Sequence, residues 1–315
     1  MTTLVLGASG FVGRALVRSL TGTGETVRAA SRTPREGDQW VTVDLEAPET
    51  LAPALENVDY VYYLVHSMGS GAGDFRATER QCAAALAHAA ANAGVRRIIY
   101  LGGVAPRGEP SEHLASRLEV GQILRAGSVP TIELRASMII GTGSASWQIL
   151  RDLAVRLPIM LLPRWLESKS CPIALADAIT ALRDARTVSM ATTSDWFDIP
   201  GNEVLSFREM LELVAALDHR RIPAIRVPVL TPRLSALWLR LVTRTDYSLA
   251  RELVLGLGSD LLPESREYWN LTGHPPVFSF RQAAEEALTS EPKGSRAARV
   301  VEGFVKAIGS HRPDA

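Results

Sequence analysis

Short apolar runs alternate with longer amphipathic stretches along the first half of the chain. The apolar runs predict strands at 3–7, 26–31, 40–43, 58–65, 98–101 and 131–140. The amphipathic stretches between them predict helices at 11–21, 79–93 and 112–126, the last two each followed by a glycine that ends a helix. Strands that alternate with helices in this way form a parallel sheet buried on both faces. The pattern therefore predicts an α/β fold.

The regular alternation of predicted strands and helices ends after the Gly141-Thr142-Gly143 turn. Segment 144–171 predicts an amphipathic helix and a Pro-broken loop. Later segments predict a strand end and helix at 172–186, a strand at 195–200, a helix at 206–217, an extended segment at 223–230 and helices at 231–257 and 279–290. Ser206 followed by Glu209 is typical of a capping box at a helix start. Trp147, Met160 and Trp165 either line an apolar pocket or pack this part of the chain, and the Pro-broken segment favours the pocket.

A glycine-rich turn joins the first predicted strand to the first helix. It reads Gly7-Ala8-Ser9-Gly10-Phe11-Val12-Gly13, a GxxGxxG spacing. Glycines at such a turn let the backbone approach a pyrophosphate at a helix N-terminus, where free N–H groups attract anions. We expect all seven residues to bind a dinucleotide; the alternative is a strand–helix turn without a ligand.

The end of the second predicted strand indicates which dinucleotide is bound. An NAD site usually has an acid here, whereas an NADP site has a cation for the 2′-phosphate. The chain has Arg32 and no acid between Val27 and Arg35. NADP(H) is therefore expected over NAD(H), unless Arg32 is only a solvated surface residue. Asp44 and Leu45, after the third strand, are expected at the adenine edge.

With the 7–13 turn, Arg32, Asp44-Leu45, Leu101-Gly102-Gly103 and Leu134-Arg135, the chain resembles the short-chain dehydrogenase/reductase superfamily. It is more similar to the atypical, NmrA-like NAD(P)H-binding branch, and 64–69 (LVHSMG) resembles a bacterial subgroup of it. The resemblance implies a Rossmann-type doubly wound sheet of about seven strands with a small C-terminal substrate lobe. We expect the Rossmann domain at 1–200, with 144–171 contributing to the lobe, the lobe at 201–290 and a peripheral tail at 291–315. Leu64 and Val65 are expected to contact the cofactor.

The catalytic groups typical of that superfamily are missing. Its members use a Tyr-x-x-x-Lys pair and a serine at the end of the fifth strand. None of the six tyrosines here has a lysine four residues later, and Gly102-Gly103 occupy the place of the serine. Position on the helix places His113 where the tyrosine would be and Arg117 where the lysine would be. His113 is then a candidate general acid and Arg117 a candidate contact to the nicotinamide ribose; equally, His113 is only part of an exposed helix start. His66 and Ser67, after a central strand, are further candidates for the catalytic set.

These features are compatible with three functions. The function we expect is that of an NADP(H)-dependent oxidoreductase acting on a small apolar carbonyl or activated alkene. The others are a sensor that binds NADP(H) without turnover and an assembly protein built on the Rossmann fold. The missing Tyr, Lys and Ser favour the last two.

The composition of the chain limits the classes of binding partner that can be expected. The 315 residues carry 34 basic and 34 acidic side chains, so no basic excess indicates a nucleic-acid partner. Cys82 and Cys171 are far apart, which argues against a disulfide framework or a metal site and fits a reducing cytoplasm. No apolar stretch is long enough to span a bilayer. A small molecule is the expected partner, and a homo-oligomer is left open.

Overall fold

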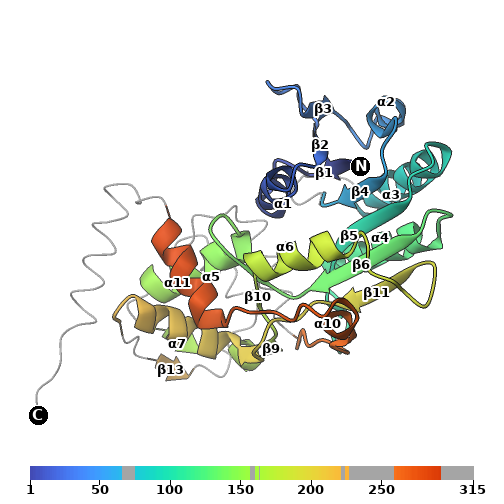
Figure 1. The fold of residues 1–315 in the computed structure, drawn as a ribbon. Coiled ribbons are helices and arrows are strands. Elements are labelled where there is room, and N and C mark those ends of the chain that lie inside the picture. The colour runs from blue at the N-terminus through green and yellow to red at the C-terminus, as the bar shows by residue number, and fades with distance from the viewer. Residues whose placement is uncertain (66–74, 157–159, 163, 221–223, 227–258, 292–315) are drawn as a thin grey trace, which may run out of the picture.

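Seven parallel strands form the central sheet of the protein (Figure 1). The computed structural model describes residues 1–65, 75–156, 160–162, 164–220, 224–226 and 259–291. The strands lie in the order β11-β6-β5-β4-β1-β2-β3. Their bounds are β1 Thr2–Leu6, β2 Thr26–Ser31, β3 Trp40–Thr42, β4 Tyr60–Tyr63, β5 Arg97–Gly103, β6 Thr131–Ala136 and β11 Asp195–Asp198. The predicted α/β class with a doubly wound parallel sheet is confirmed.

Helices cover both faces of the sheet because side chains alternate along each strand. Val5 of β1 packs with Leu16 of α1 (Phe11–Gly22) and Ala178 of α6 (Leu175–Asp184). Its neighbours Leu4 and Leu6 belong to the opposite core, with α3 (Phe75–Asn92) and α4 (Glu112–Ala126). Each strand thus serves two cores, which explains its nearly continuous apolar sequence.

The chain changes direction across the sheet between β1 and β4. From β1 it proceeds through β2 to β3 at one edge, and from β4 it proceeds through β5 and β6 to β11 at the other. Neighbouring loops at such a switch point diverge and leave a crevice at the carboxyl ends of the strands. The 7–13 turn and the segment after β4 both begin at this place.

A third core lies beside the sheet and is built from the later part of the chain. Its principal elements are β7 (Ile139–Ile140), α5 (Ala145–Arg156), β10 (Ile173–Ala174), α7 (Phe207–Leu217) and α11 (Phe280–Ser290). Trp147 is wholly buried in it, and its Nε1 donates to Glu291 Oε1 at 3.1 Å. The expectation that Trp147 lines a pocket is therefore wrong, because packing against α7 and α11 encloses the ring. The side chains of Met160 and Trp165 lie outside what the structure describes.

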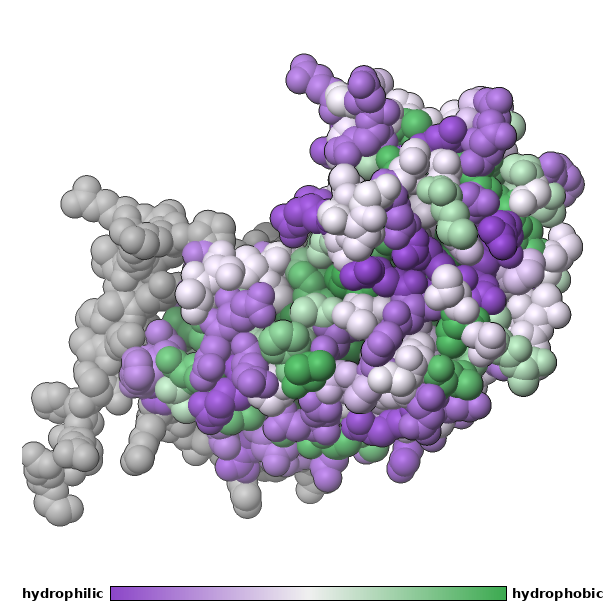
Figure 2. All heavy atoms as spheres, in the orientation of Figure 1, coloured by the Kyte–Doolittle hydropathy of each residue, from purple (hydrophilic) through white to green (hydrophobic). Residues whose placement is uncertain are grey.

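Smaller elements complete the described chain. They are η1 Pro48–Thr50, α2 Leu51–Leu55, β8 Met160–Leu162, η2 Arg164–Glu167, β9 Lys169–Ser170, β12 Leu205–Ser206, β13 Ala224–Arg226 and α10 Glu267–Thr272. On the face shown in Figure 2, hydrophobic residues lie scattered among hydrophilic ones.

Two predicted boundaries are wrong. Helix α3 begins at Phe75 rather than at residue 79, and the predicted strand 131–140 divides into β6 and β7. The division follows Ala136, where the Ser137 hydroxyl donates to the carbonyl oxygen of Cys171 at 2.9 Å and the chain pairs with β10 instead of the main sheet. The predicted helix 231–257 and most of the 291–315 tail lie outside the described residues.

Candidate functional site

Gly7 ends β1 in a conformation that requires glycine. Its φ is +81°, in the left-handed region, and a Cβ atom there would lie 2.6 Å from the Leu64 carbonyl oxygen. Leu64 follows β4, and its N–H donates to Leu6 at 3.0 Å. The glycine-rich turn thus packs directly against the backbone of Leu64, the residue after β4, at the switch point of the sheet.

The other two glycines of the turn shape the start of α1. Gly13 is buried, and a Cβ atom there would come within 2.1 Å of the Gly7 carbonyl oxygen. That oxygen accepts the Gly10 N–H at 2.9 Å. Gly10 is the exposed N-cap of α1, and no side chain caps the helix there. The first turn of α1 therefore directs N–H groups and the positive end of the helix dipole toward the crevice.

The remaining residues of the turn serve mainly to hold it. Ala8 is buried, and the Ser9 carbonyl oxygen accepts from the Arg14 guanidinium. The Phe11 ring packs against Gly141: a Cβ atom on Gly141 would lie 3.0 Å from the ring. Val12 packs against the core shared with β1. All seven predicted residues thus belong to one rigid strand–turn–helix unit.

Arg32 follows the last residue of β2 and is exposed. In the register of β1 with β2, Val5 faces Ala29, so the ends of both strands lie at the same edge. The structure thereby brings Arg32 to the edge that carries the 7–13 turn. Asp44 is half-buried, with its Oδ1 accepting the Glu46 N–H at 3.1 Å, and Leu45 is packed in the core. Both remain predicted adenine contacts.

A second guanidinium, absent from the predicted site, lies beside Arg32. Arg35 donates from Nε to Ser31 Oγ at 3.1 Å, and its guanidinium carbon lies 4.9 Å from the centre of the Trp40 ring. These contacts hold Arg35 at the end of β2. The signal that sequence reasoning missed is Ser31, Arg35 and Trp40 taken together, since the connection between the parallel strands β2 and β3 determines which of them meet.

Leu64 and Val65 are half-buried at the crevice, as expected from their place after β4. The Leu64 backbone contacts Gly7, as described above. His66 and Ser67, the candidate catalytic residues that follow, lie outside the described residues.

Arg117 and His113 lie on the first two turns of α4, at the carboxyl end of β5. An Arg117 terminal nitrogen lies 3.9 Å from where a Cβ atom on Gly103 would be. The His113 ring packs on Phe75, with 4.7 Å between ring centres. Ser111, not His113, caps the helix by accepting the Leu114 N–H. The structure therefore brings Arg117 to the end of β5, and His113 is held by an aromatic contact to the start of α3.

The central tyrosines are unsuited to replace the missing acid. Burial raises the pKa of Tyr62, Tyr63 and Tyr100. The Tyr62 hydroxyl donates to the Leu182 carbonyl oxygen at 2.8 Å, and that of Tyr100 donates to the Arg117 carbonyl oxygen at 3.0 Å. Two of these hydroxyls are thus committed to the backbone, and all three resist ionisation.

The cysteines are equally poor nucleophiles. Both are buried, and burial raises the pKa of Cys82 to about 11 and also raises that of Cys171. A thiol that stays protonated near neutral pH reacts slowly. Cys82 lies on α3 and packs in the core that this helix shares with the sheet.

A buried carboxylate that sequence reasoning missed lies behind the end of β5. Glu133 of β6 is wholly buried, and its oxygens accept from Arg135 Nε at 2.8 Å and Arg125 Nε at 3.0 Å. A Cβ atom on Gly102 or Gly121 would lie 2.8 or 2.3 Å from that carboxylate. At Gly102, near the strand end where the resemblance would place a serine, the glycine thus leaves room for the Glu133 carboxylate.

Two kinds of feature are absent from the described ranges. No three His, Cys, Asp or Glu side chains within them gather as a metal site would require. None of their helices is both long and apolar enough to cross a membrane.

Residues 7–151 match a protein family model described as NAD(P)H-binding. The matched range begins at the first glycine of the turn. It includes Arg32, Arg117 and the strands from β2 to β6. No curated protein sequence matches the chain significantly.

Several solved structures share the fold over nearly the whole chain. MoeE5 in complex with UDP-glucuronic acid and NAD has a TM-score of 0.70 at 17% identity, covering 92% of this chain and 98% of its own. A short-chain dehydrogenase/reductase superfamily protein from Agrobacterium tumefaciens with bound NAD has a TM-score of 0.67 at 20% identity, covering 96% and 99%. UDP-glucose 4-epimerase from Thermotoga maritima has a TM-score of 0.69 at 14% identity, covering 92% and 98%. At these identities the likeness establishes the Rossmann-like fold.

Proposed function

We propose that the chain binds NADP(H) in the crevice between β1 and β4 and is an oxidoreductase of the atypical, NmrA-like short-chain dehydrogenase/reductase type. The observation that carries the proposal is the Gly7–Gly13 turn. Its positive φ at Gly7 and its contact with Leu64 form a backbone cradle at an uncapped helix N-terminus. The pyrophosphate of the cofactor would lie on this cradle.

The preference for NADP(H) over NAD(H) is supported by charge at the end of β2. Arg32 and Arg35 place two guanidinium groups beside the turn, and no acid lies between them. A guanidinium pairs well with a phosphate because it offers forked N–H donors. Two solved neighbours are described with NAD, so this preference is where the chain would differ from them.

The substrate we propose is a small, fairly apolar carbonyl or activated alkene. The bound cofactor would supply the hydride. His113, with His66 or Ser67, would provide or orient the proton, and Arg117 would contact the nicotinamide ribose. Support for this assignment is the place of Arg117 beside Gly103 and of His113 one turn before it, at the carboxyl end of a central strand.

Titration of the purified protein with NADPH and NADH, followed by nicotinamide fluorescence, tests cofactor binding. The wild type is expected to bind NADPH more tightly, and R32E to lose that preference while keeping NADH affinity. Unchanged selectivity in R32E would refute the part proposed for Arg32. A carbonyl and enone panel followed at the nicotinamide absorbance then tests turnover, with His113→Ala expected to lower kcat on any substrate found.

A second candidate function is an NADP(H)-binding sensor without turnover. The observation that favours a sensor is that the hydroxyls of Tyr62 and Tyr100 donate to backbone carbonyl oxygens and are not free to act as a proton donor. Tight NADPH binding with no oxidation across the panel would decide for the sensor.

A further inference from the structure

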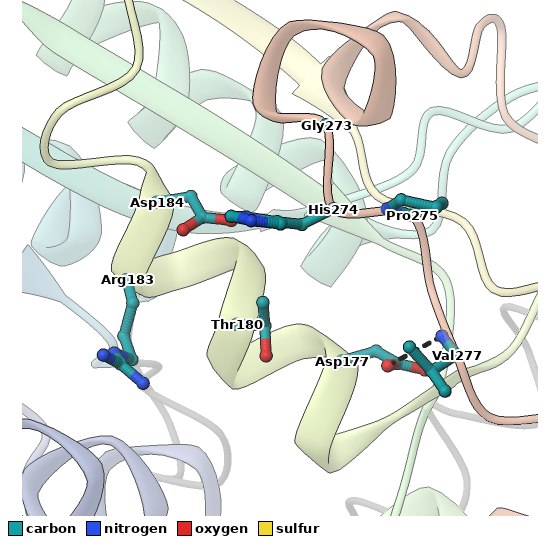
Figure 3. A pocket seen from close by; sticks show the side chains of 8 residues that line it. All are labelled: Asp177, Thr180, Arg183, Asp184, Gly273, His274, Pro275 and Val277. Atoms are coloured by element: carbon teal, nitrogen blue, oxygen red, sulfur yellow. Dashed lines mark hydrogen bonds and ion pairs between the residues drawn. The ribbon is translucent and has the colours of Figure 1, made fainter.

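A cavity of about 430 Å³ lies between α6 and the segment that follows α10 (Figure 3). It is lined by Asp177, Thr180, Arg183, Asp184, Gly273, His274, Pro275 and Val277. The inner side of α6 packs against the sheet, so the helix separates this cavity from the β1/β4 crevice. Its volume is within the range of small-molecule sites.

Both carboxylates of the cavity already have partners. Asp177 accepts the backbone N–H groups of Val277 and Phe278 at 3.0 and 3.1 Å, which fastens the segment to the start of α6. Asp184 Oδ2 lies 2.9 Å from His274 Nδ1 at the other end of the helix, and Figure 3 shows the imidazole directed at that carboxylate. The acidic groups are therefore occupied in holding the cavity together.

Arg183 is different, because its guanidinium has no side-chain or ion-pair partner among the described residues. Its Nε is buried and finds no acceptor there. A buried donor without an acceptor is unfavourable, and such groups are rare in folded proteins. In Figure 3 Arg183 extends from α6 on the same side as Thr180. The lining thus offers an unpaired cation.

Apolar residues line another part of the same cavity. Val277 is 76% exposed although it is aliphatic, and Pro275 precedes it on the same segment. We propose that the cavity binds a small organic anion, a carboxylate or a phosphate monoester, whose charge pairs with Arg183 and whose apolar part lies on Pro275 and Val277. The site is additional to the proposed cofactor crevice and does not depend on it.

Benzoate and phenyl phosphate are suitable probes, with benzamide as the neutral counterpart. Binding is followed by saturation-transfer NMR and calorimetry, with and without saturating NADPH. We expect one or both anions to bind in both conditions and benzamide to bind at least about tenfold more weakly, as expected for loss of a charged hydrogen bond. The preferred anion distinguishes a carboxylate from a phosphate ligand. Displacement of both anions by NADPH would overturn the proposal, whereas failure of NADPH to bind would affect only the proposed cofactor function.

Two variants and one control locate the site. Arg183→Gln should weaken anion binding at least about tenfold, and Arg281→Gln, an equal charge change at an exposed residue of α11, should leave it unchanged. Val277→Glu places a negative charge on an exposed side chain and should also weaken binding without unfolding the protein. If neither anion binds, or if the Arg183 and Arg281 variants have equal affinities, the proposal is overturned.

Discussion

The carbonyl oxygen of Leu64 lies 2.6 Å from the position that a Cβ atom on Gly7 would occupy. This contact joins the end of β1 to the end of β4 across the switch point of the sheet. Any side chain at residue 7 would push apart the two strands that flank the proposed cofactor crevice.

Gly7→Ala should therefore damage both stability and NADPH binding. The positive φ alone costs about 1–2 kcal/mol, and the backbone clash adds to it, for a total above about 3 kcal/mol. Gly24→Ala is the matched control, because Gly24 has φ +78° and open space around it. Urea unfolding and NADPH titration of both variants check this; equal losses of stability would show that the Leu64 contact does not matter.

Arg35 should add to the selectivity proposed for Arg32. Its contacts with Ser31 and Trp40 restrict its side chain before any ligand binds. Arg35→Gln is expected to weaken NADPH binding by roughly tenfold, the loss of one charged hydrogen bond, and to leave NADH binding unchanged. Fluorescence titration measures both; an equal loss for the two cofactors would place Arg35 away from the 2′-phosphate.

Glu133→Gln should be strongly destabilising. It would leave the Arg125 and Arg135 guanidinium groups facing a neutral amide in the interior, and breaking a buried pair costs about 3–5 kcal/mol. Glu119→Gln is the control, since Glu119 pairs with Arg76 and Arg80 near the surface and should cost at most about 1 kcal/mol. Chemical unfolding compares the variants, and similar losses would contradict the importance assigned to the buried network.

Asp198 should make stability depend on pH. Burial raises the pKa of this carboxyl, although the Glu264 and Ser265 N–H groups and Arg135 oppose the rise. A raised folded-state pKa means that its stabilising contribution is present below the ordinary aspartate pKa and is lost as pH rises through the folded value. Relative to Asp198→Asn, the wild type should thus lose unfolding free energy as pH rises from about 4. A difference between the two proteins that does not vary with pH would contradict this.

Local signals in the sequence were sufficient for several elements. The capping box at α7 forms as predicted, with Ser206 Oγ accepting the Glu209 N–H at 3.2 Å and Glu209 Oε2 accepting the Ser206 N–H at 2.7 Å. The 7–13 turn likewise lies between a strand and a helix. Both depend on residues close in the chain, so their hydrogen bonds can be anticipated from spacing.

Contacts between distant segments could not be anticipated in this way. In the sequence, Glu133 is only a polar residue within an apolar strand. The packing of β5, β6 and α4 shows why residues 102 and 121 are glycines, because any Cβ atom there would clash with the Glu133 carboxylate. The sequence around Trp147 favoured a pocket residue over a core residue, and the packing with α7 and α11 shows that Trp147 belongs to the core.

The sequence alone therefore determined the alternation of strands and helices, the glycine-rich turn and the lack of a Tyr-Lys pair, because these depend on periodicity and spacing. The tertiary structure decided that Gly7 meets Leu64, that Arg35 joins Arg32 at the sheet edge, and that Arg183 is left unpaired in a cavity under segment 273–277. Such relationships depend on which distant surfaces pack together, and packing is a property of the whole chain.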